Sequence, residues 1–363
     1  MSAYDVVVVG GGIGGLTVAA LLSARGLNTC LLERQSQVGG CIARVEFSGY
    51  DFEPGMGLYT SFGAGEVYDT LFSQLPVATP EATLLTSPYV LRRADGSDVR
   101  MPTDDLYSIA GGPATLAERL AESIKQSGGK LRLNSPVLRL AYDESGCAIG
   151  VDLLSGERVL AKKAIVSNLT IWDTYGKLVG LNRTPGEIKK HLATFHGTGV
   201  YVVYAGIEEP AVTRLPAERM RVEDSEGEFN LAFSSSGIAP PGKRAVTFTT
   251  RTEIDSWFAY QSSEEDYEEW DQDALAHFWN RLHTAIPELG SDIEVIETAN
   301  PRTYYDSTRR KLGMVLGIDG AVEVGHQTSV KGLFMIGDTV VSESKVETVV
   351  QSAVSLAETI LPE

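Results

Sequence analysis

The chain has 363 residues, of which 43% are hydrophobic and 22% charged, and its formal net charge is −17. This composition is typical of a globular protein long enough for two domains, and no apolar run is long enough for a transmembrane helix. The acidic surface repels phosphate backbones and anionic headgroups, so we expect no nucleic-acid partner and no stable membrane insertion. Three cysteines without a CxxC pair or metal-ligand spacing favour a reducing, cytoplasmic location with no disulfide and no metal site.

The chain begins with a strand, a glycine-rich turn and a helix. Residues 6–9 are four valines, which predict a buried strand, and Gly10-x-Gly12-x-x-Gly15 follows before a helix that ends at Gly26. In this motif Gly10 permits a tight turn, Gly12 lets the backbone approach a pyrophosphate, and Gly15 lets the helix pack on the strand. The free N–H groups at the helix N-terminus then face the phosphates.

A second strand, over residues 29–32, ends at Glu33. An acidic side chain about 20 residues after the glycines is the one that binds the ribose hydroxyls of a dinucleotide. Because strand, turn, helix, strand and acid occur in this order, we predict a bound dinucleotide rather than a glycine-rich turn without a ligand. Two further glycine clusters follow, Gly39-Gly40 and Gly55-Met56-Gly57.

The middle of the chain alternates between strands and helices. A hairpin is predicted over 84–101 with its turn at Asp95-Gly96, and a short polar loop over 101–110 joins it to a helix that starts after Gly112. A long acidic amphipathic helix is predicted over about 264–286. Further strands are expected at 199–206, 229–234, 245–251 and 293–299.

The chain closes on a short apolar run that ends in Gly337-Asp338 and on a final helix to about residue 360. With the opening motif and the two glycine clusters, this order of motifs resembles the phytoene desaturase and carotenoid isomerase branch of the FAD-dependent amine oxidase superfamily. The resemblance implies an α/β fold, with a Rossmann-like FAD-binding domain and a mixed-sheet α+β substrate domain. It places the FAD domain at about 1–65, 105–170 and 325–363, and the substrate domain at 66–104 and 171–324.

FAD is the cofactor that this resemblance implies. In the family a later glycine pair lies beside the pyrophosphate, a strand at the position of Val137 contacts the adenine, and the Gly-Asp pair contacts the ribityl-phosphate region. The residues expected to bind FAD are Gly10, Gly12, Ile13, Gly14, Gly15, Glu33, Arg34, Gly39, Gly40, Cys41, Gly55, Met56, Gly57, Val137, Asn168, Gly337, Asp338 and Val346.

The sequence departs from these relatives in one large feature. They carry a long helical insert between the early hairpin and the glycine-rich helix start, whereas residues 101–110 join the two directly here. We therefore expect a small-molecule substrate that is smaller or more polar than a carotenoid. The active site is expected to be open or covered by a partner, which leaves a protein partner or a homo-oligomer as alternatives.

The start of the final helix provides the first candidate for catalysis. Ser344 to Glu347 fits a capping box, with Ser344 as N-cap and Glu347 at the third helical position. In relatives this helix start points at the flavin pyrimidine edge, so Lys345 could stabilise the anionic reduced flavin. The alternative is a solvent-facing lysine paired with Glu343 or Glu347.

Two further candidates come from segments that resemble the family's substrate domain. His196 precedes a strand that resembles the one over the isoalloxazine and could transfer a proton, or it is a hydrogen-bonded structural histidine. Tyr305, or its neighbour Tyr304, could line the substrate pocket or be buried in the core. Cys41 stands where many relatives have arginine, and we expect a small packing residue there.

Three arginines, Arg302, Arg309 and Arg310, add positive charge near the same segment. They could bind a carboxylate substrate, but pairing with Asp306 in solvent is the expected arrangement.

We predict an FAD-dependent oxidoreductase in which a carbon of the substrate gives hydride to flavin N5. The chain has no second strand–GxGxxG–helix unit for a nicotinamide cofactor, so oxygen, a quinone or another acceptor is expected to take the electrons. Two alternatives remain. One is a non-redox isomerase that needs reduced flavin, and the other is a flavin-binding accessory subunit completed by a partner chain.

Overall fold

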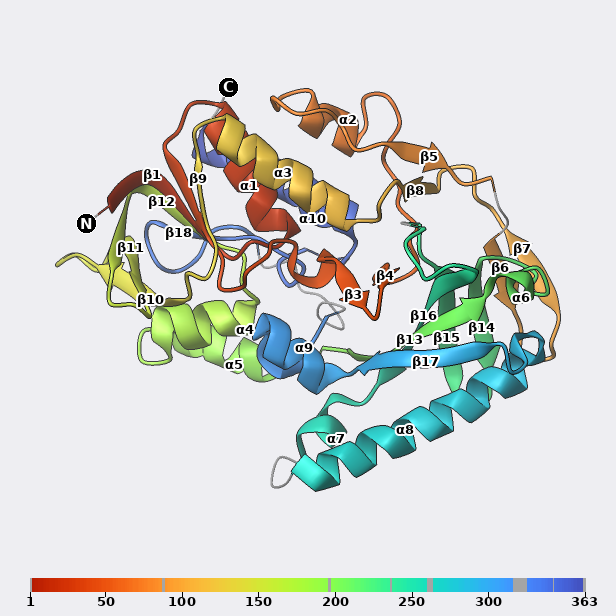
Figure 1. Cartoon of the computed structure of the whole chain (residues 1–363). Helices are drawn as coiled ribbons and strands as arrows, with labels where there is room; N and C mark the ends of the chain where they lie inside the picture. Colours follow the sequence, from red (N-terminus) through yellow and green to blue (C-terminus); the bar gives the residue numbers. More distant parts are fainter. Residues whose placement is uncertain are drawn as a thin grey trace.

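The computed structural model describes residues 2–86, 89–194, 197–235, 237–259, 264–315, 325–341 and 343–361. Within these ranges the strands form two seven-stranded sheets and two small two-stranded ones. Figure 1 shows the two large sheets next to each other, with helices on their outer sides. The α/β fold predicted from the sequence is confirmed.

The first large sheet contains the opening strand of the chain. Its order is β10-β11-β12-β1-β2-β9, with β18 beside β12, and β1 runs parallel to both β12 and β2. Val6 to Val9 of β1 are at most 3% exposed, as a strand covered on both faces requires. The strands are β1 Ser2–Val9, β2 Thr29–Leu32, β9 Lys130–Arg132, β10 Val137–Tyr142, β11 Ala148–Leu153, β12 Arg158–Ser167 and β18 Leu333–Met335.

Three helices cover one face of this sheet: α1 Ile13–Ala24, α3 Ala114–Gln126 and α10 Val346–Ile360 (Figure 1). Ten of the twelve residues of α1 are buried, because α3 and α10 both pack against it. A Cβ atom on Gly15 would lie 2.2 Å from the carbonyl oxygen of Gly10, so only glycine lets α1 start this close to the strand. The helix position therefore follows directly from the glycine motif.

The second large sheet has the order β17-β13-β16-β15-β14-β6-β7. All neighbours are antiparallel except β14 and β6, so the sheet is mixed, as predicted. The predicted strands are confirmed here, but β14 was not predicted. The strands are β6 Tyr89–Arg92, β7 Asp98–Met101, β13 Gly199–Glu208, β14 Arg219–Asp224, β15 Gly227–Phe233, β16 Lys243–Thr252 and β17 Ile293–Ala299.

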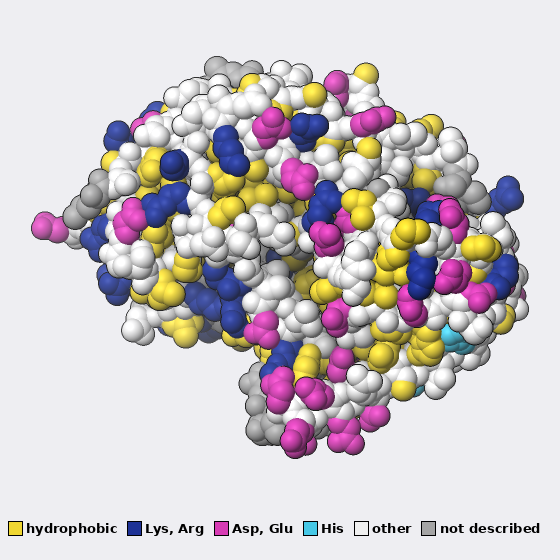
Figure 2. Space-filling model, viewed as in Figure 1, with side chains coloured by type: hydrophobic (Ala, Val, Ile, Leu, Met, Phe, Trp, Pro, Cys, Tyr) yellow, Lys and Arg dark blue, Asp and Glu magenta, His cyan; other side chains and the backbone are white. Residues whose placement is uncertain are grey.

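Helix α8, Glu264–Ala285, runs along this second sheet and confirms the predicted amphipathic helix (Figure 1). Phe278 and Leu282 are buried on its inner side, in one core cluster with strand residues such as Phe229. Figure 2 shows acidic side chains at the lower edge of the molecule, over the first part of α8, where Glu264, Glu265 and Asp266 form its first turn. The acidic side is thus a solvated face.

The loop predicted over 101–110 is in part a strand. Tyr107–Ile109 forms β8 and pairs antiparallel with β5, Ala82–Leu84, because this short connection runs back beside the chain that precedes the hairpin. The remaining elements are η1 Gly40–Ile42, β3 Val45–Phe47, β4 Tyr50–Phe52, α2 Val67–Phe72, α4 Ile171–Asp173, η2 Thr174–Gly180, α5 Gly186–Thr194, α6 Glu209–Val212, α7 Ile254–Ala259, η3 Pro287–Leu289, α9 Pro301–Thr308 and η4 Lys311–Gly313.

Among the residues that the structure describes, none of the helices combines the length and the apolar character needed to span a bilayer.

Candidate cofactor site

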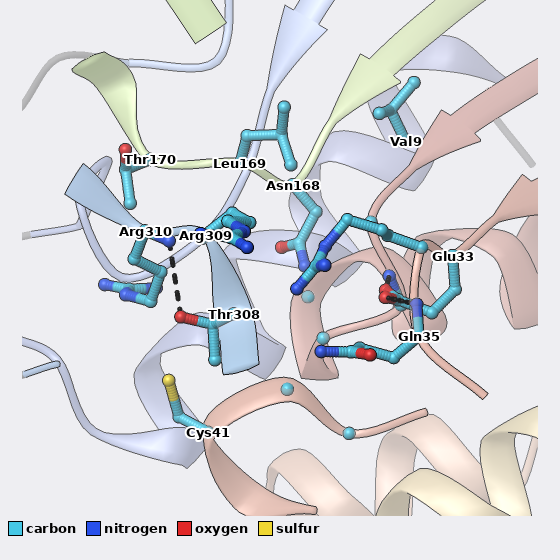
Figure 3. A pocket seen from close by; sticks show the side chains of 18 of the residues that line it. Val9, Glu33, Gln35, Cys41, Asn168, Leu169, Thr170, Thr308, Arg309 and Arg310 are labelled. Atoms are coloured by element: carbon cyan, nitrogen blue, oxygen red, sulfur yellow. Dashed lines mark hydrogen bonds between the residues drawn. The ribbon is translucent and has the colours of Figure 1, made fainter. Parts of the chain in front are cut away.

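A cavity of about 440 Å³ lies where β1, β2 and β12 end at their carboxyl ends. The glycine-rich loop follows β1, Glu33 follows β2 and Asn168 follows β12, so three neighbouring strands each contribute one wall. In Figure 3, Glu33 and Gln35 lie on one side of this cavity, and Thr308 and Arg310 lie across from them. Parallel α/β sheets bind their ligands at this edge.

The glycine-rich loop leaves no room for side chains at its glycine positions. Gly10 has φ of +100°, and a Cβ atom on Gly12 would lie 2.7 Å from Nδ2 of Asn168. Gly12 is also the N-cap of α1, so no side chain caps the N–H groups of the first helical turn. These N–H groups and the positive end of the helix dipole are therefore available to phosphate oxygens.

Glu33 stands at the edge of this loop. Its Oε2 accepts a hydrogen bond from the N–H of Gly11 at 2.6 Å, and its Oε1 accepts one from the N–H of Gln35 at 2.7 Å. Both contacts fix the carboxylate at the cavity wall, in the place where the sequence predicts a ligand for ribose hydroxyls.

The opposite wall carries an ion pair that the sequence did not predict. Arg310 donates from Nη1 to Oδ1 of Asp338 at 3.1 Å and from Nη2 to Oδ2 at 2.5 Å, and both residues line the cavity. The expected pairing of Arg310 with Asp306 is therefore wrong, because the chain turns after α9 and directs Arg310 inward. A guanidinium so placed adds positive charge beside the Gly337-Asp338 turn.

The other two arginines of this segment pair elsewhere. Arg309 binds Asp306 at 3.1 Å, as expected, whereas Arg302 binds Glu264 at 3.0 Å.

Cys41 lies in the wall near Arg310 (Figure 3). Burial raises the pKa of its thiol, and the nearby Arg310 lowers it by less. A protonated thiol at this position agrees with the packing role predicted for it.

The start of α10 differs from the predicted capping box. The helix begins at Val346 with Lys345 as N-cap, and no side chain caps it. Glu347 instead accepts a hydrogen bond from Oγ1 of Thr60 at 2.8 Å, and the Ser344 hydroxyl donates to the carbonyl of Asp338 at 3.4 Å. The capping box is wrong because both of its side chains bind other elements.

Lys345 and Val346 nevertheless line the cavity. The ammonium of Lys345 lies 2.8 Å from a carboxylate oxygen of Glu343, both side chains are more than half exposed, and this contact raises the pKa of Lys345. The pairing with Glu343 is one of the two alternatives left open by the sequence. A role of Lys345 toward a flavin stays a prediction.

Tyr305 does not line this cavity. Tyr305 packs edge-to-face on Phe258, with 5.8 Å between ring centres, and the guanidinium of Arg309 lies 5.1 Å from its ring. Tyr304 belongs to a core cluster with Tyr204. His196 lies outside the described residues.

The residues predicted to bind the cofactor fall into two groups. Gly15 lies in the first turn of α1 and packs against the carbonyl of Gly10, and it does not line the cavity. Gly55, Met56 and Gly57 do not line it either; the carbonyl of Met56 accepts a hydrogen bond from Arg219. The remaining predicted residues line it: Gly10, Gly12, Ile13, Gly14, Glu33, Arg34, Gly39, Gly40, Cys41, Val137, Asn168, Gly337, Asp338 and Val346.

An uncapped helix N-terminus beside a fixed carboxylate is the arrangement by which Rossmann-like folds bind a dinucleotide, and this protein is of that class. Residues 8–75 match the NAD(P)-binding Rossmann-like domain, and residues 90–361 match the flavin containing amine oxidoreductase. Since the second match covers about three quarters of the sequence, the chain belongs to the family of flavin-containing amine oxidoreductases.

Individual relatives are more distant. The chain is 27% identical over 252 residues to a chloroplastic prolycopene isomerase of Arabidopsis thaliana, covering 63% of this chain and 41% of that protein. It is 42% identical over 272 residues to an all-trans-retinol 13,14-reductase of Danio rerio, covering 62% and 45%. It thus spans about two fifths of the length of these curated relatives.

Among solved structures, an oxidoreductase from Methanosarcina mazei superimposes with a TM-score of 0.75 at 15% sequence identity, covering 97% of this chain and 99% of that one. This likeness shows the shared fold.

Family membership confirms the flavin cofactor and the oxidoreductase class that the sequence predicts. The residues present fit FAD. Its pyrophosphate suits the glycine loop that a Cβ atom would fill, and its ribose suits the carboxylate of Glu33.

Proposed function

We propose that this chain is an FAD-dependent oxidoreductase that removes hydrogen from a carbon of a small organic substrate. The observation that carries the proposal is the single cavity that joins the glycine loop, Glu33 and the Asp338 turn to the N-terminus of α10. The glycine loop and Glu33 come from the start of the sequence, and Asp338 and α10 come from its end.

Each wall of the cavity has a role in this proposal. The first-turn N–H groups of α1 hold the pyrophosphate, Glu33 accepts from the ribose hydroxyls, and Val137 borders the adenine. Arg310 fixes the carboxylate of Asp338 by two hydrogen bonds, and in this proposal Asp338 contacts the ribityl-phosphate region. When bound, FAD supplies the two-electron chemistry that amino-acid side chains lack.

The positive end of the α10 dipole and the ammonium of Lys345 face the same cavity. Both favour negative charge at that end, which makes a reduced, anionic flavin easier to form. The contribution of Lys345 is reduced by Glu343, whose carboxylate lies 2.8 Å away.

The second candidate function is isomerisation of a polyene by reduced flavin without net oxidation. The similarity to prolycopene isomerase over 63% of this chain favours it. In that case the same residues would hold the cofactor, and the substrate would leave with its mass unchanged.

Two measurements test both functions. Heat release of the flavin followed by mass spectrometry is expected to yield FAD, and release of FMN or no flavin would contradict the site. Anaerobic mixing with candidate substrates, prolycopene among them, is then followed at the flavin absorption band. Bleaching with an oxidised product supports the oxidoreductase, whereas turnover that requires pre-reduced flavin and conserves the product mass supports the isomerase.

A further inference from the structure

A second pocket of about 340 Å³ lies on the second large sheet, beside β5. It shares no lining residue with the cofactor cavity. Two cations and two hydroxyls, Arg219, Arg244, Ser234 and Ser235, form its polar wall, and Leu85 and Phe233 are part of its apolar wall. The arginines stand at the starts of β14 and β16, which are separated in the sheet by β15.

Arg219 is the centre of the polar wall. It is only 5% exposed, and it donates from Nε to the carbonyl of Met56 at 3.2 Å and from Nη2 to the hydroxyl of Ser235 at 3.0 Å. A guanidinium carries five N–H donors, so three remain for a ligand. Across the described part of the chain, no carboxylate oxygen lies within 4 Å of its nitrogens. Its charge acts on the buried carboxylate of Glu53, whose pKa it lowers against the effect of burial, but without a direct ion pair between the two. An anion that enters the pocket would therefore still find guanidinium N–H groups to accept from.

Two acidic side chains lie near the pocket, Glu218 and Glu53, and each has a hydrogen-bond or ion-pair partner other than Arg219. Glu218 pairs with Arg244 at 3.4 Å at the outer edge of the pocket. Glu53 lies behind the wall, where Oε2 accepts a hydrogen bond from the N–H of Ser235 at 2.9 Å, and it does not line the pocket. Glu218 thus lines the pocket as well, but its carboxylate is paired with Arg244 rather than with Arg219.

We propose that this pocket binds a small molecule that carries a carboxylate. The planar guanidinium of Arg219 presents parallel donors that match the two oxygens of a carboxylate, and the hydroxyls of Ser234 and Ser235 stand beside it. Leu85 offers an apolar contact to the carbon skeleton of the ligand, whereas the ring of Phe233 lies under Arg244, whose guanidinium carbon is 5.3 Å from its centre. The proposal goes beyond the flavin chemistry, because the two pockets are lined by separate residues.

Calorimetry on the full, flavin-loaded chain tests this assignment, with benzoate and succinate as probes. Each carboxylate is expected to bind saturably at one site, and the neutral amides benzamide and succinamide are expected not to bind. Arg219→Met should weaken carboxylate binding at least tenfold, because hydrogen bonds to a charged group are lost. Arg251→Met is the matched control, since Arg251 is an exposed arginine on the same strand as Arg244 and should leave binding unchanged.

Arg219 is buried, so two milder variants protect the test against misfolding. Arg219→Lys keeps the charge but loses the fork of donors, and Arg244→Met removes the half-exposed cation; both should weaken binding severalfold while flavin content stays constant. The proposal is overturned if neither carboxylate binds the wild-type chain, or if Arg219→Lys and Arg244→Met both bind as tightly as wild type. Binding of inorganic phosphate in place of carboxylates would also overturn it.

Discussion

The carboxylate of Glu33 is fixed by the backbone N–H groups of Gly11 and Gln35 before any ligand arrives. Glu33→Gln keeps the shape of the side chain and removes its charge. We expect the dissociation constant of FAD to rise roughly tenfold or more, because a hydrogen bond to a charged group is worth about 1.5–3 kcal/mol. Fluorescence titration of the flavin-free protein measures it. Glu144→Gln, in an exposed turn, is the control, and equal affinity of both variants would contradict the role of Glu33.

Arg310 and Asp338 form the second residue-scale feature, with side chains 15% and 20% exposed. Arg310→Met leaves Asp338 without its partner and removes a positive charge from the cavity. We expect weaker FAD binding together with a lower melting temperature of the flavin-free protein, since breaking such a pair costs up to about 3 kcal/mol. Adding Asp338→Asn to Arg310→Met should cost less than the sum of the two single changes. Simple additivity would show that the pair does not act as a unit.

The sequence alone could not assign Arg310 this role. A glycine motif can be recognised in the sequence, because few residues other than glycine tolerate the backbone conformation of such a loop. Arg310 has no such pattern, and its contact with Asp338 exists only because the turn after α9 passes the end of β18. Its neighbour Arg309 binds Asp306 at the exposed surface. Two adjacent arginines thus differ in burial and in partner, and nothing in the local sequence distinguishes them.

At the scale of elements, the N-terminus of α10 is the part of the cavity where charge is easiest to alter. Lys345→Met is expected to lower the flavin reduction potential and Glu343→Gln to raise it, each by about 6–20 mV, because an exposed charge at a helix end contributes about 0.3–1 kcal/mol. Photoreduction against a reference dye measures both potentials.

Lys189→Met, on the exposed side of α5, controls for the loss of a distant positive charge. If Lys345→Met shifts the potential no more than this control does, Lys345 acts only as the partner of Glu343.

Elements with a strong local pattern were predicted well. The valine run of β1, the alternating strands of the second sheet and the amphipathic α8 each follow from the periodicity of their own residues. By contrast, β8 exists because β5 lies beside it, and the capping box at α10 was lost because Thr60 binds Glu347. Such partners are distant in sequence, so local patterns cannot identify them.

For the molecule as a whole, the cavity lies between parts of the chain that belong to different sheets. The loops after β1 and β2 form one side, and the segment after α9, which follows β17 of the second sheet, forms the other. Because FAD binds the folded chain and not the unfolded one, a hundredfold excess over its dissociation constant should raise the free energy of unfolding by about 2.7 kcal/mol. Thermal unfolding with and without flavin measures this gain.

Hydrogen exchange on the same samples tests whether both sides take part. FAD should slow exchange in residues 9–14 and also in 301–310, whereas ADP, which lacks the flavin half, should protect mainly the former. Protection by FAD confined to the first sheet would contradict a shared site.

The contacts across this cavity also determine how fast its contents exchange with solvent. The guanidinium of Arg34 donates to the carbonyls of Asp306 and Ser307 at 3.3 and 2.6 Å, and the side-chain amide of Gln35 also donates to Ser307. These bonds connect the segment after β2 to α9, and Arg34, Gln35 and Ser307 all line the cavity. We therefore expect a bound flavin to have a long residence time. Gln35→Ala should shorten the residence time and speed uptake by a similar factor, leaving affinity nearly constant. Stopped-flow displacement by labelled FAD measures both rates, and unchanged rates would show that the molecule opens elsewhere.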